Sequence, residues 1–351
     1  MTHGRWMHRP EGSNWGDFGE NDQLGRLNLI TPAKVLEGVA EVKEGRTFCL
    51  SLPLDLPGGS VLSARRHPPS IEPTLRDGQP NVNFPMNRVD PRYVDLLCDD
   101  KVTLCTQYST QWDALGHVGA KFDADGDGIA EGRYYNGYRA DTDVRGPARY
   151  TEKGQEPTGG PYRLGALGIE HMAVHGIQGR GVMVDLHAHF GRTRARIGAK
   201  ELADVLEKDK VIVEPGDILC LHTGFDEIIL EAKGNPDPAV VASSCCVLDG
   251  RDDRLAQWIT HSGIAAIACD NFAIEAVPAP DPDDPTSESF PGLPLHHHCL
   301  FKLGLPFGEL WYLRELAQWL RGAGRSRFLL TAPPLRLPGA AGSPVTPIAT
   351  V

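Results

Sequence analysis

Residues 180–190, with the sequence RGVMVDLHAHF, are the stretch on which the fold class depends most. They begin as an apolar, β-branched run, which is typical of a buried strand, and they end in polar side chains. The segments EPGDILCLHTGF (214–225) and IAAIACD (264–270) predict two more strands of this kind. Amphipathic periodicity predicts helices at 200–208 and 253–263, between the predicted strands. This mixture of strands and helices indicates an α/β fold.

Further elements are predicted on both sides of this segment. They are a helix that begins at Thr31 and Pro32, strands at 46–56, 102–110 and 326–335, and an amphipathic helix at 308–324. Residues 57–100 and 278–294 are rich in Pro, Gly and Asp and have no clean period, so they predict loops. No repeat occurs and no biased linker divides the chain. We therefore expect one α/β domain, residues 1–351, with a mixed sheet.

Composition limits the classes of function that we expect. The chain has 351 residues and a formal net charge of −11 at pH 7, which argues against non-specific binding to nucleic acid. No apolar window approaches the roughly 18 to 20 residues of a membrane span, and the polar N-terminus lacks the apolar core of a secretory signal. The 8 cysteines include no CxxC pair and predict reduced thiols. We expect a cytoplasmic protein that acts on a small molecule.

A first candidate site lies in residues 106–117, TQYSTQWDALGH. In an extended strand Gln107, Gln111 and Asp113 point to one face, and His117 follows just beyond them. Two amide oxygens, a carboxylate and an imidazole on one surface suit a metal ion. The same pattern also fits a site that has lost its metal, or polar residues that merely solvate a strand end.

A second candidate lies in residues 295–310, LHHHCLFKLGLPFGEL, where three histidines are adjacent. An exposed polar patch is the simplest interpretation of these histidines. However, Glu309 follows His297 by twelve residues and opens the predicted helix at 308–324. If the fold brings His297 and Glu309 to Asp113, the three side chains form a suitable site for a divalent ion.

Two other segments carry weaker signals. Residues 123–132, DADGDGIAEG, resemble a calcium loop, but Tyr134 stands where the glutamate that completes such a loop is required. Asp185, His187 and His189 alternate along a predicted strand and would form either a second metal site or hydrogen-bonded scaffolding. The sequence contains no GxSxG nucleophile motif and no Gly-rich phosphate loop.

Taken together, these motifs resemble the cyclase family of metal-dependent hydrolases, to which kynurenine formamidase and isatin hydrolase belong. The family signature is HxGTHxDxxxH, and the resemblance extends from about residue 15 to residue 350. Four further stretches carry it: WGDFGENDQLGRLNLITPAKVLEG (15–38), HGIQGRGVMVDL (175–186), GIAAIACDNFAIEAVP (263–278) and GAAGSPVTPIA (339–349). The resemblance implies a swivelling β/β/α domain, usually found in dimers or tetramers.

The resemblance also implies roles for individual residues. The two leading histidines of the signature fall on Gln107 and Gln111, its aspartate on Asp113 and its last histidine on His117; the downstream histidine and glutamate fall on His297 and Glu309. The family's aspartate, downstream histidine and glutamate hold metal, and the last histidine of the signature acts as acid and base. Because amide oxygens bind metal more weakly than imidazole, we expect one divalent ion, manganese or zinc, with Gln111 or Gln107 as additional ligands.

We therefore expect a metal-dependent hydrolase that cleaves an amide, cyclic amide or N-formyl group, with His117 as general acid and base. Aromatic residues near the motif, Tyr108 and Trp112, indicate a cyclic or aromatic substrate, although core packing explains them equally well. Alternatives are a lactone hydrolase that uses the same site, a metal-poor pseudoenzyme that binds a small ligand, and a structural protein that binds calcium at 123–134.

Overall fold

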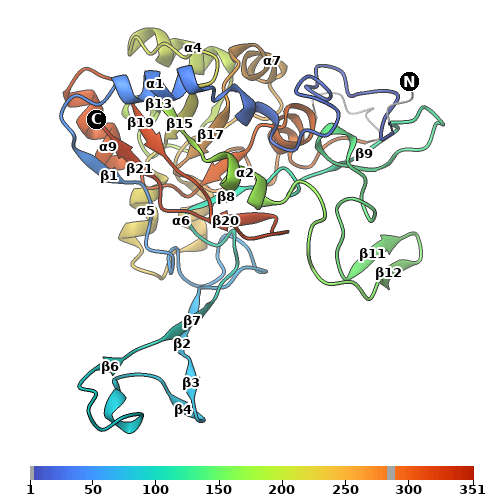
Figure 1. Ribbon diagram of the computed structural model, residues 1–351. Coiled ribbons are helices and arrows are strands. Elements are labelled where there is room, and N and C mark those ends of the chain that lie inside the picture. Colours follow the sequence, from blue (N-terminus) through green and yellow to red (C-terminus); the bar gives the residue numbers. More distant parts are fainter. Residues whose placement is uncertain (1–3, 283–288) are drawn as a thin grey trace.

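The computed structural model describes residues 4–282 and 289–351, and its centre is a nine-stranded mixed sheet (Figure 1). The strands follow the order β1-β21-β19-β13-β15-β17-β18-β8-β20. Their bounds are Thr47–Cys49 (β1), Gln111–Asp113 (β8), Gln178–Asp185 (β13), Ile218–His222 (β15), Ala266–Cys269 (β17), Phe307–Glu309 (β18), Arg327–Thr331 (β19), Gly342–Pro344 (β20) and Ile348–Thr350 (β21). The α/β fold with a mixed sheet is confirmed.

Four adjacent strands in the sheet, β13, β15, β17 and β18, run parallel to one another. The remaining pairs in this sheet are antiparallel. Parallel strands are buried on both faces, which explains why the predicted strands at 180–190, 214–225 and 264–270 are nearly continuous apolar runs. Successive side chains of these strands divide between two apolar cores, one on each face of the sheet.

Short helices cover both faces of the sheet. Their bounds are Pro32–Ala40 (α1), Ile169–His175 (α2), His187–Phe190 (α3), Ala199–Lys208 (α4), Phe225–Glu231 (α5), Pro238–Ser243 (α6), Asp253–Ser262 (α7), Pro294–His296 (α8) and Arg314–Gly322 (α9), with a π-helix at His297–Leu303. Helices α4 and α7 confirm the helices predicted at 200–208 and 253–263. No helix within the described residues is long and apolar enough to cross a membrane.

The two cores show how the sheet and the helices fit together. Leu202 of α4 and Leu255 of α7 pack with Leu219 of β15 on one face. Leu316 of α9 packs with Cys220 of β15 on the other face. Neighbouring residues of β15 therefore pack against helices on opposite faces of the sheet. This packing on both faces holds the central strands, and so their ends, in place.

Helix α1 begins at the cap that the sequence predicts. The hydroxyl of Thr31 accepts a hydrogen bond from the backbone N–H of Lys34 at 3.3 Å, and Pro32 occupies the first helical position. The helix ends at Ala40, and its Leu36 is exposed.

Residues 70–103 form an arm that projects from the body of the molecule (Figure 1). The loop predicted at 57–100 is confirmed for residues 57–69, whereas short strands occur in the arm, where no strand was predicted. The arm contains three antiparallel pairs: Ser70–Pro73 (β2) with Asp100–Thr103 (β7), Leu75–Arg76 (β3) with Gln79–Pro80 (β4), and Phe84–Pro85 (β5) with Leu96–Leu97 (β6). Strands of two to four residues are too short to leave a period in the sequence, which is why the prediction missed them.

Two boundaries next to the candidate site also differ from the prediction. The strand expected at 102–110 is wrong for residues 104–110, because β7 ends at Thr103 in the arm and β8 begins only at Gln111 in the main sheet. The helix expected at 308–324 begins only at Arg314, and Glu309 lies in strand β18 instead. Of the loop predicted at 278–294, residues 283–288 lie outside the described part of the chain.

Candidate metal centre

Strand β8 positions the first two side chains of the site. Gln111 and Asp113 point to one face of the strand and Trp112 to the other, as the alternation of an extended strand requires. Gln111 pairs directly with Glu309 of β18, and its side-chain Nε2 donates to Glu309 Oε2 at 2.9 Å. On the other side of β8, Gly342 of β20 lies opposite Asp113. A Cβ at this glycine would lie 2.7 Å from the side-chain nitrogen of Gln107, so the missing side chain leaves the room that Gln107 occupies.

Asp113, His296 and Glu309 form a buried cluster that could hold a metal ion. Each offers one ligand atom, and the three atoms lie within 4.8 Å of one another. All three residues are at most 3 % exposed, so water does not solvate their charges. They come from β8, α8 and β18, which are distant in sequence and meet only in the folded chain.

Several oxygens of this cluster have no hydrogen-bond donor among the described residues. They are both carboxylate oxygens of Asp113, Oε1 of Glu309 and Oε1 of Gln111. A buried polar atom without a partner costs roughly 1 to 3 kcal/mol, and more when it is charged. A cation would satisfy all of these oxygens at once. Carboxylate oxygens with one imidazole nitrogen are a donor set that suits Mn²⁺ or Zn²⁺, so the residues fit a divalent ion.

The histidine in the cluster is His296, whereas the sequence analysis assigned this place to His297. His296 ends α8, and its Nε2 lies 3.4 Å from Glu309 Oε1. His297 starts the π-helix and packs against Phe301, with 4.9 Å between the ring centroids, and it is not part of the cluster. With three adjacent histidines, spacing to Glu309 could not identify the correct one, because the direction of each side chain depends on where the helix begins.

Glu275 holds His296 in the orientation that a metal ligand needs. Its Oε1 lies 2.8 Å from His296 Nδ1 and also accepts the backbone N–H of His296, while its Oε2 accepts the backbone N–H of Leu295, both at 2.9 Å. A carboxylate at Nδ1 places the proton on that nitrogen and leaves Nε2 free for a metal. The backbone before Glu275 is unusual, since Ala273 and Ile274 both have positive φ angles. Such conformations concentrate at functional sites.

We predict that Glu275→Gln weakens metal binding by about 10- to 100-fold, the usual cost of losing the partner of a metal-bound histidine. The glutamine amide has the size of the carboxylate, but it lacks the negative charge that interacts with His296. The metal dissociation constant, measured by competition with a chromophoric chelator, checks this expectation. Glu72→Gln in the exposed arm is the control and should leave the dissociation constant unchanged. Equal dissociation constants for the wild type, Glu275→Gln and Glu72→Gln would contradict the prediction.

His117 lies beside the cluster and is partly accessible. Its Nε2 is 3.9 Å from Asp113 Oδ1, and its side chain is 23 % exposed, so it is accessible to solvent whereas Asp113 is not. Its Nδ1 is 3.3 Å from Nε2 of Gln107. Gln107 therefore contacts His117 and not the cluster, and its own Oε1 accepts from the Thr106 hydroxyl at 2.9 Å.

The charges of the cluster depend on one another. Burial raises the pKa of Asp113 to about 6, and the negative charge of Glu309 adds to the rise. Burial also opposes the ionisation of Glu309, but the contact with His296 lowers the pKa of Glu309 overall. Burial opposes the charging of His296 as well, yet Glu275 and Glu309 raise its pKa to about 10. A positive charge at the centre of the cluster is therefore favoured.

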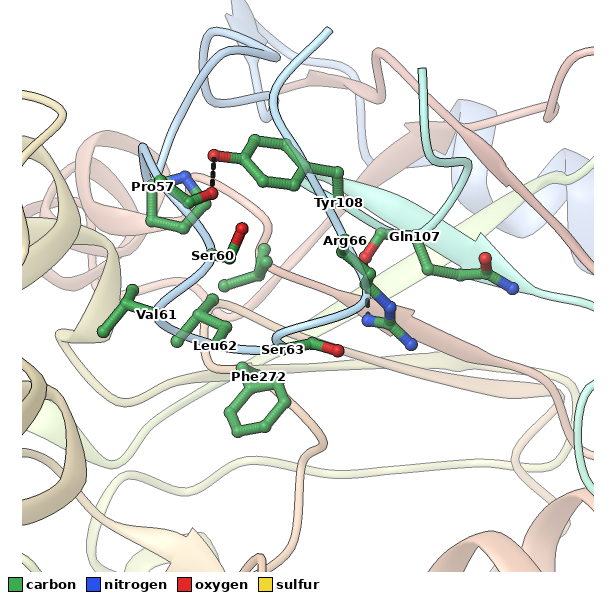
Figure 2. Close-up of a pocket in the computed structure, with 11 residues that line it drawn as sticks. Pro57, Ser60, Val61, Leu62, Ser63, Arg66, Gln107, Tyr108 and Phe272 are labelled. Carbon is green, nitrogen blue, oxygen red and sulfur yellow. Dashed lines mark hydrogen bonds between the residues drawn. The ribbon is translucent and has the colours of Figure 1, made fainter.

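The two aromatic residues assigned to substrate binding occupy different positions. Trp112 is fully buried in the core, where its indole N–H donates to the backbone oxygen of Ala332 at 2.8 Å, so it is not available to a substrate. The alternation of side chains along β8 explains the burial of Trp112, because Trp112 points to the face opposite Gln111 and Asp113. Tyr108 lines a pocket next to Gln107, and its hydroxyl donates to the backbone oxygen of Gly59 at 3.0 Å (Figure 2).

A second buried group of His222, Asp226 and Asp270 also has ligand atoms within 4.8 Å of one another. Asp270 is already saturated, because its two oxygens accept from three backbone N–H groups and the Thr223 hydroxyl at 2.7 to 3.0 Å. Asp185 accepts from His222 Nδ1 at 2.8 Å. These hydrogen bonds join the ends of β13, β15 and β17. Asp185 therefore takes the role of hydrogen-bonded scaffolding, one of the two roles that the sequence left open.

The other two members of the motif at 185–189 are not on one strand face, since β13 ends at Asp185 and His187 begins helix α3. The ring nitrogen Nδ1 of His187 lies 3.2 Å from the backbone oxygen of Thr223, and Nε2 of His189 lies 3.0 Å from Asp209. Both histidines are thus held by local partners.

Asp123, Asp125 and Asp127 lie together, as a calcium loop would require. Strands β9 (Ala120–Phe122) and β10 (Glu131–Arg133) flank them in place of the two helices of that motif. The oxygens of Asp123 accept backbone N–H groups from Gly126 and Gly128, which makes the segment a hairpin turn.

Three residues of the site escaped the sequence analysis. Glu275 lies within the stretch 263–278 that resembles the cyclase family, and an acidic residue after a predicted strand was the available signal. His296 was hidden among three histidines. Arg66 lies in a stretch that predicted only loop, and it influences the charge of Asp113 and Glu309 from the wall of the pocket in Figure 2.

Comparison with known proteins identifies the family. The family model named Cyclase matches residues 50–276. A crystal structure described as a novel cyclase is 29 % identical, covers 100 % of this chain and 99 % of its own, and gives a TM-score of 0.72. Isatin hydrolase A from Labrenzia aggregata, bound to benzyl benzoate, is 12 % identical over 90 % of this chain and 97 % of its own, with a TM-score of 0.52.

Isatin hydrolase A from Ralstonia solanacearum is also 12 % identical, over 91 % of this chain and 97 % of its own, with a TM-score of 0.52. At this identity the two isatin hydrolases show a shared fold. No curated protein sequence matches the chain significantly. The family model, however, covers well over half of the chain, and the resemblance predicted from the sequence is confirmed: this protein belongs to the cyclase family.

Proposed function

We propose that this protein is a metal-dependent hydrolase that cleaves an amide, a cyclic amide or an N-formyl group of a small substrate. The observation that carries the proposal is the buried cluster of Asp113, His296 and Glu309, whose unpartnered oxygens converge where a cation would lie. The fold shared with two isatin hydrolases supports it, since those proteins are named for a hydrolysis reaction.

Asp113, His296 and Glu309 would hold a single divalent ion, manganese or zinc. When bound, such an ion lowers the pKa of water towards neutrality and polarises a carbonyl group. Gln111 donates its amide N–H to Glu309, so it positions that carboxylate, and its own buried Oε1 has no hydrogen-bond partner among the described residues. Gln107 contacts His117 instead, which removes it from the proposed ligand set.

His117 would carry the protons of the reaction. Imidazole exchanges protons near neutral pH, and His117 is the partly exposed histidine beside the cluster. It takes a proton from the attacking water and delivers one to the leaving nitrogen. The carbon–nitrogen bond breaks, and an acid and an amine are released. Gln107 contacts Nδ1 of the His117 ring at 3.3 Å, and Nε2 lies on the side of Asp113.

We predict that a chelator inactivates the purified protein and that Mn²⁺ or Zn²⁺ restores activity. The reason is that, without the ion, the carboxylates cannot lower the pKa of the attacking water. Elemental analysis should give about one ion per chain, and a screen of N-formyl amides, cyclic imides and lactones should find the bond that is cleaved. Turnover that persists after complete removal of metal would contradict the proposal, and a preference for lactones would move the enzyme to ester hydrolysis.

A further inference from the structure

The arm at residues 70–103 exposes a large amount of apolar surface. It projects from the body of the molecule (Figure 1), and none of its residues belongs to the four apolar cores of the described chain. The large apolar side chains that are exposed along it are Ile71, Leu75, Val82, Val89, Tyr93, Val94, Leu96 and Val102. Single exposed apolar residues are ordinary on a protein surface, whereas many of them on one short segment mark a site of interaction.

Two of these side chains stand directly opposite each other. Ile71 of β2 is the register partner of Val102 of β7, and the two residues are 71 % and 54 % exposed. Side chains at opposite positions of an antiparallel pair lie on the same face of the ribbon. They therefore form one apolar, β-branched surface that no other part of the described chain covers.

Hydrogen bonds rather than apolar packing hold the arm in shape. Asn81 is the only buried residue of the arm, all of which the structure describes. Its side-chain Nδ2 donates to Asp99 Oδ2 at 2.7 Å, and its backbone N–H donates to the backbone oxygen of Thr74 at 2.8 Å. A two-stranded ribbon by itself is only marginally stable in water, and its outer edges leave backbone groups unpaired. The arm therefore gains stability when another surface covers it.

The charges of the arm favour a protein surface as the partner. The arm contains six acidic and four basic residues, which are interspersed along its length. Nucleic acid and anionic lipid surfaces attract strongly basic segments, and the arm is not basic. Because both signs are present, acidic groups of one arm can face basic groups of an identical arm. The charge pattern is thus compatible with self-association.

The apolar area is of the size that a stable dimer requires. Burying an exposed Val, Leu or Ile side chain removes on the order of 100 Å² of apolar surface, so the eight side chains together supply on the order of 800 Å². A standard interface takes about 800 Å² from each partner. In a two-fold symmetric dimer both chains use the same patch, so each arm supplies one half of the interface.

We propose that the arm binds a second copy of this chain, and that the face formed by Ile71 and Val102 is part of the contact. The inference goes beyond the proposed hydrolase function and does not depend on it, because the arm contains none of the residues of the metal cluster. Association would cover the exposed apolar side chains and support the short strands of the arm.

Sedimentation equilibrium of the full chain tests the inference. The wild type should associate to twice the 38.2 kDa of one chain or to a higher multiple. The double variant Ile71→Thr, Val102→Thr should raise the dissociation constant of the oligomer by about 10- to 100-fold, because polar groups replace apolar surface on both copies. Threonine keeps the strand preference of the residues that it replaces, so the ribbon should still form. Leu36→Thr, at an exposed position of α1, is the matched control and should leave the dissociation constant unchanged.

Hydrogen exchange gives a second readout that is confined to the arm. The amide protons of β2 and β7 should exchange more slowly as the concentration of the wild type rises, and this dependence should weaken in the double variant. The amide protons of β13 and β15 should exchange equally in both proteins, which shows that the body stays folded.

Three results would overturn the inference. They are a wild type that stays monomeric at every concentration, an oligomer whose dissociation constant the double variant leaves unchanged, and arm amide protons whose exchange does not depend on concentration. If the monomer instead binds vesicles of phosphatidylcholine, and the double variant does not, the arm binds lipid and not a second copy.

Discussion

Asp113→Ala is expected to abolish both the binding of a divalent ion and hydrolysis. Asp113 is 1 % exposed, and both of its carboxylate oxygens lack a partner among the described residues. Its loss removes one of two negative charges that would balance the ion. The loss of affinity should exceed the roughly 10- to 100-fold that is typical of a group outside the ligand set. Elemental analysis after dialysis against micromolar Mn²⁺ or Zn²⁺ measures it directly.

The thermal stability of the same variant gives an independent readout. A ligand that binds only the folded chain at 100 times its dissociation constant adds about 2.7 kcal/mol to the free energy of unfolding. Metal should therefore raise the melting temperature of the wild type and not that of Asp113→Ala. Asp123→Ala, in the hairpin turn between β9 and β10, is the control and should respond like the wild type. An Asp113→Ala protein that keeps its metal would refute the assignment of the ligand set.

His117→Asn should lower kcat by about 100- to 10,000-fold, the range typical of losing a general acid or base. Asparagine fills a similar space and can still contact Gln107, but it cannot exchange a proton near neutral pH. His117 lies beside the cluster, with 3.9 Å between Nε2 and Asp113 Oδ1. The metal content should therefore stay near that of the wild type, which separates this variant from Asp113→Ala.

The pH dependence of kcat supplies the decisive comparison for His117. The pH profile of kcat should differ between the wild type and His117→Asn, because the variant lacks the imidazole that transfers the proton. His261→Asn, at an exposed position in α7, is the control for the removal of an imidazole and should behave as the wild type. If His117→Asn retains more than about a tenth of the wild-type kcat, another group transfers the proton.

The sequence predicted the central part of the fold because those strands have a strong local signal. The strands at 180–190, 214–225 and 264–270 are buried on both faces, so nearly every residue in them is apolar. The helices α4 and α7 have one buried face, and their periodicity shows it. The arm at 70–103 has no such signal, because its paired strands are only two to four residues long.

From the sequence by itself, the motifs, their spacing and the family resemblance predicted Asp113, His117 and Glu309 as candidate site residues. Only the tertiary structure decided that His296 rather than His297 faces Glu309, that Trp112 belongs to the core, and that Glu275 contacts His296. The physical reason is that a motif fixes the order of residues along one strand or turn. The direction of a side chain depends on where each element begins, and contacts between distant elements exist only after the sheet has formed.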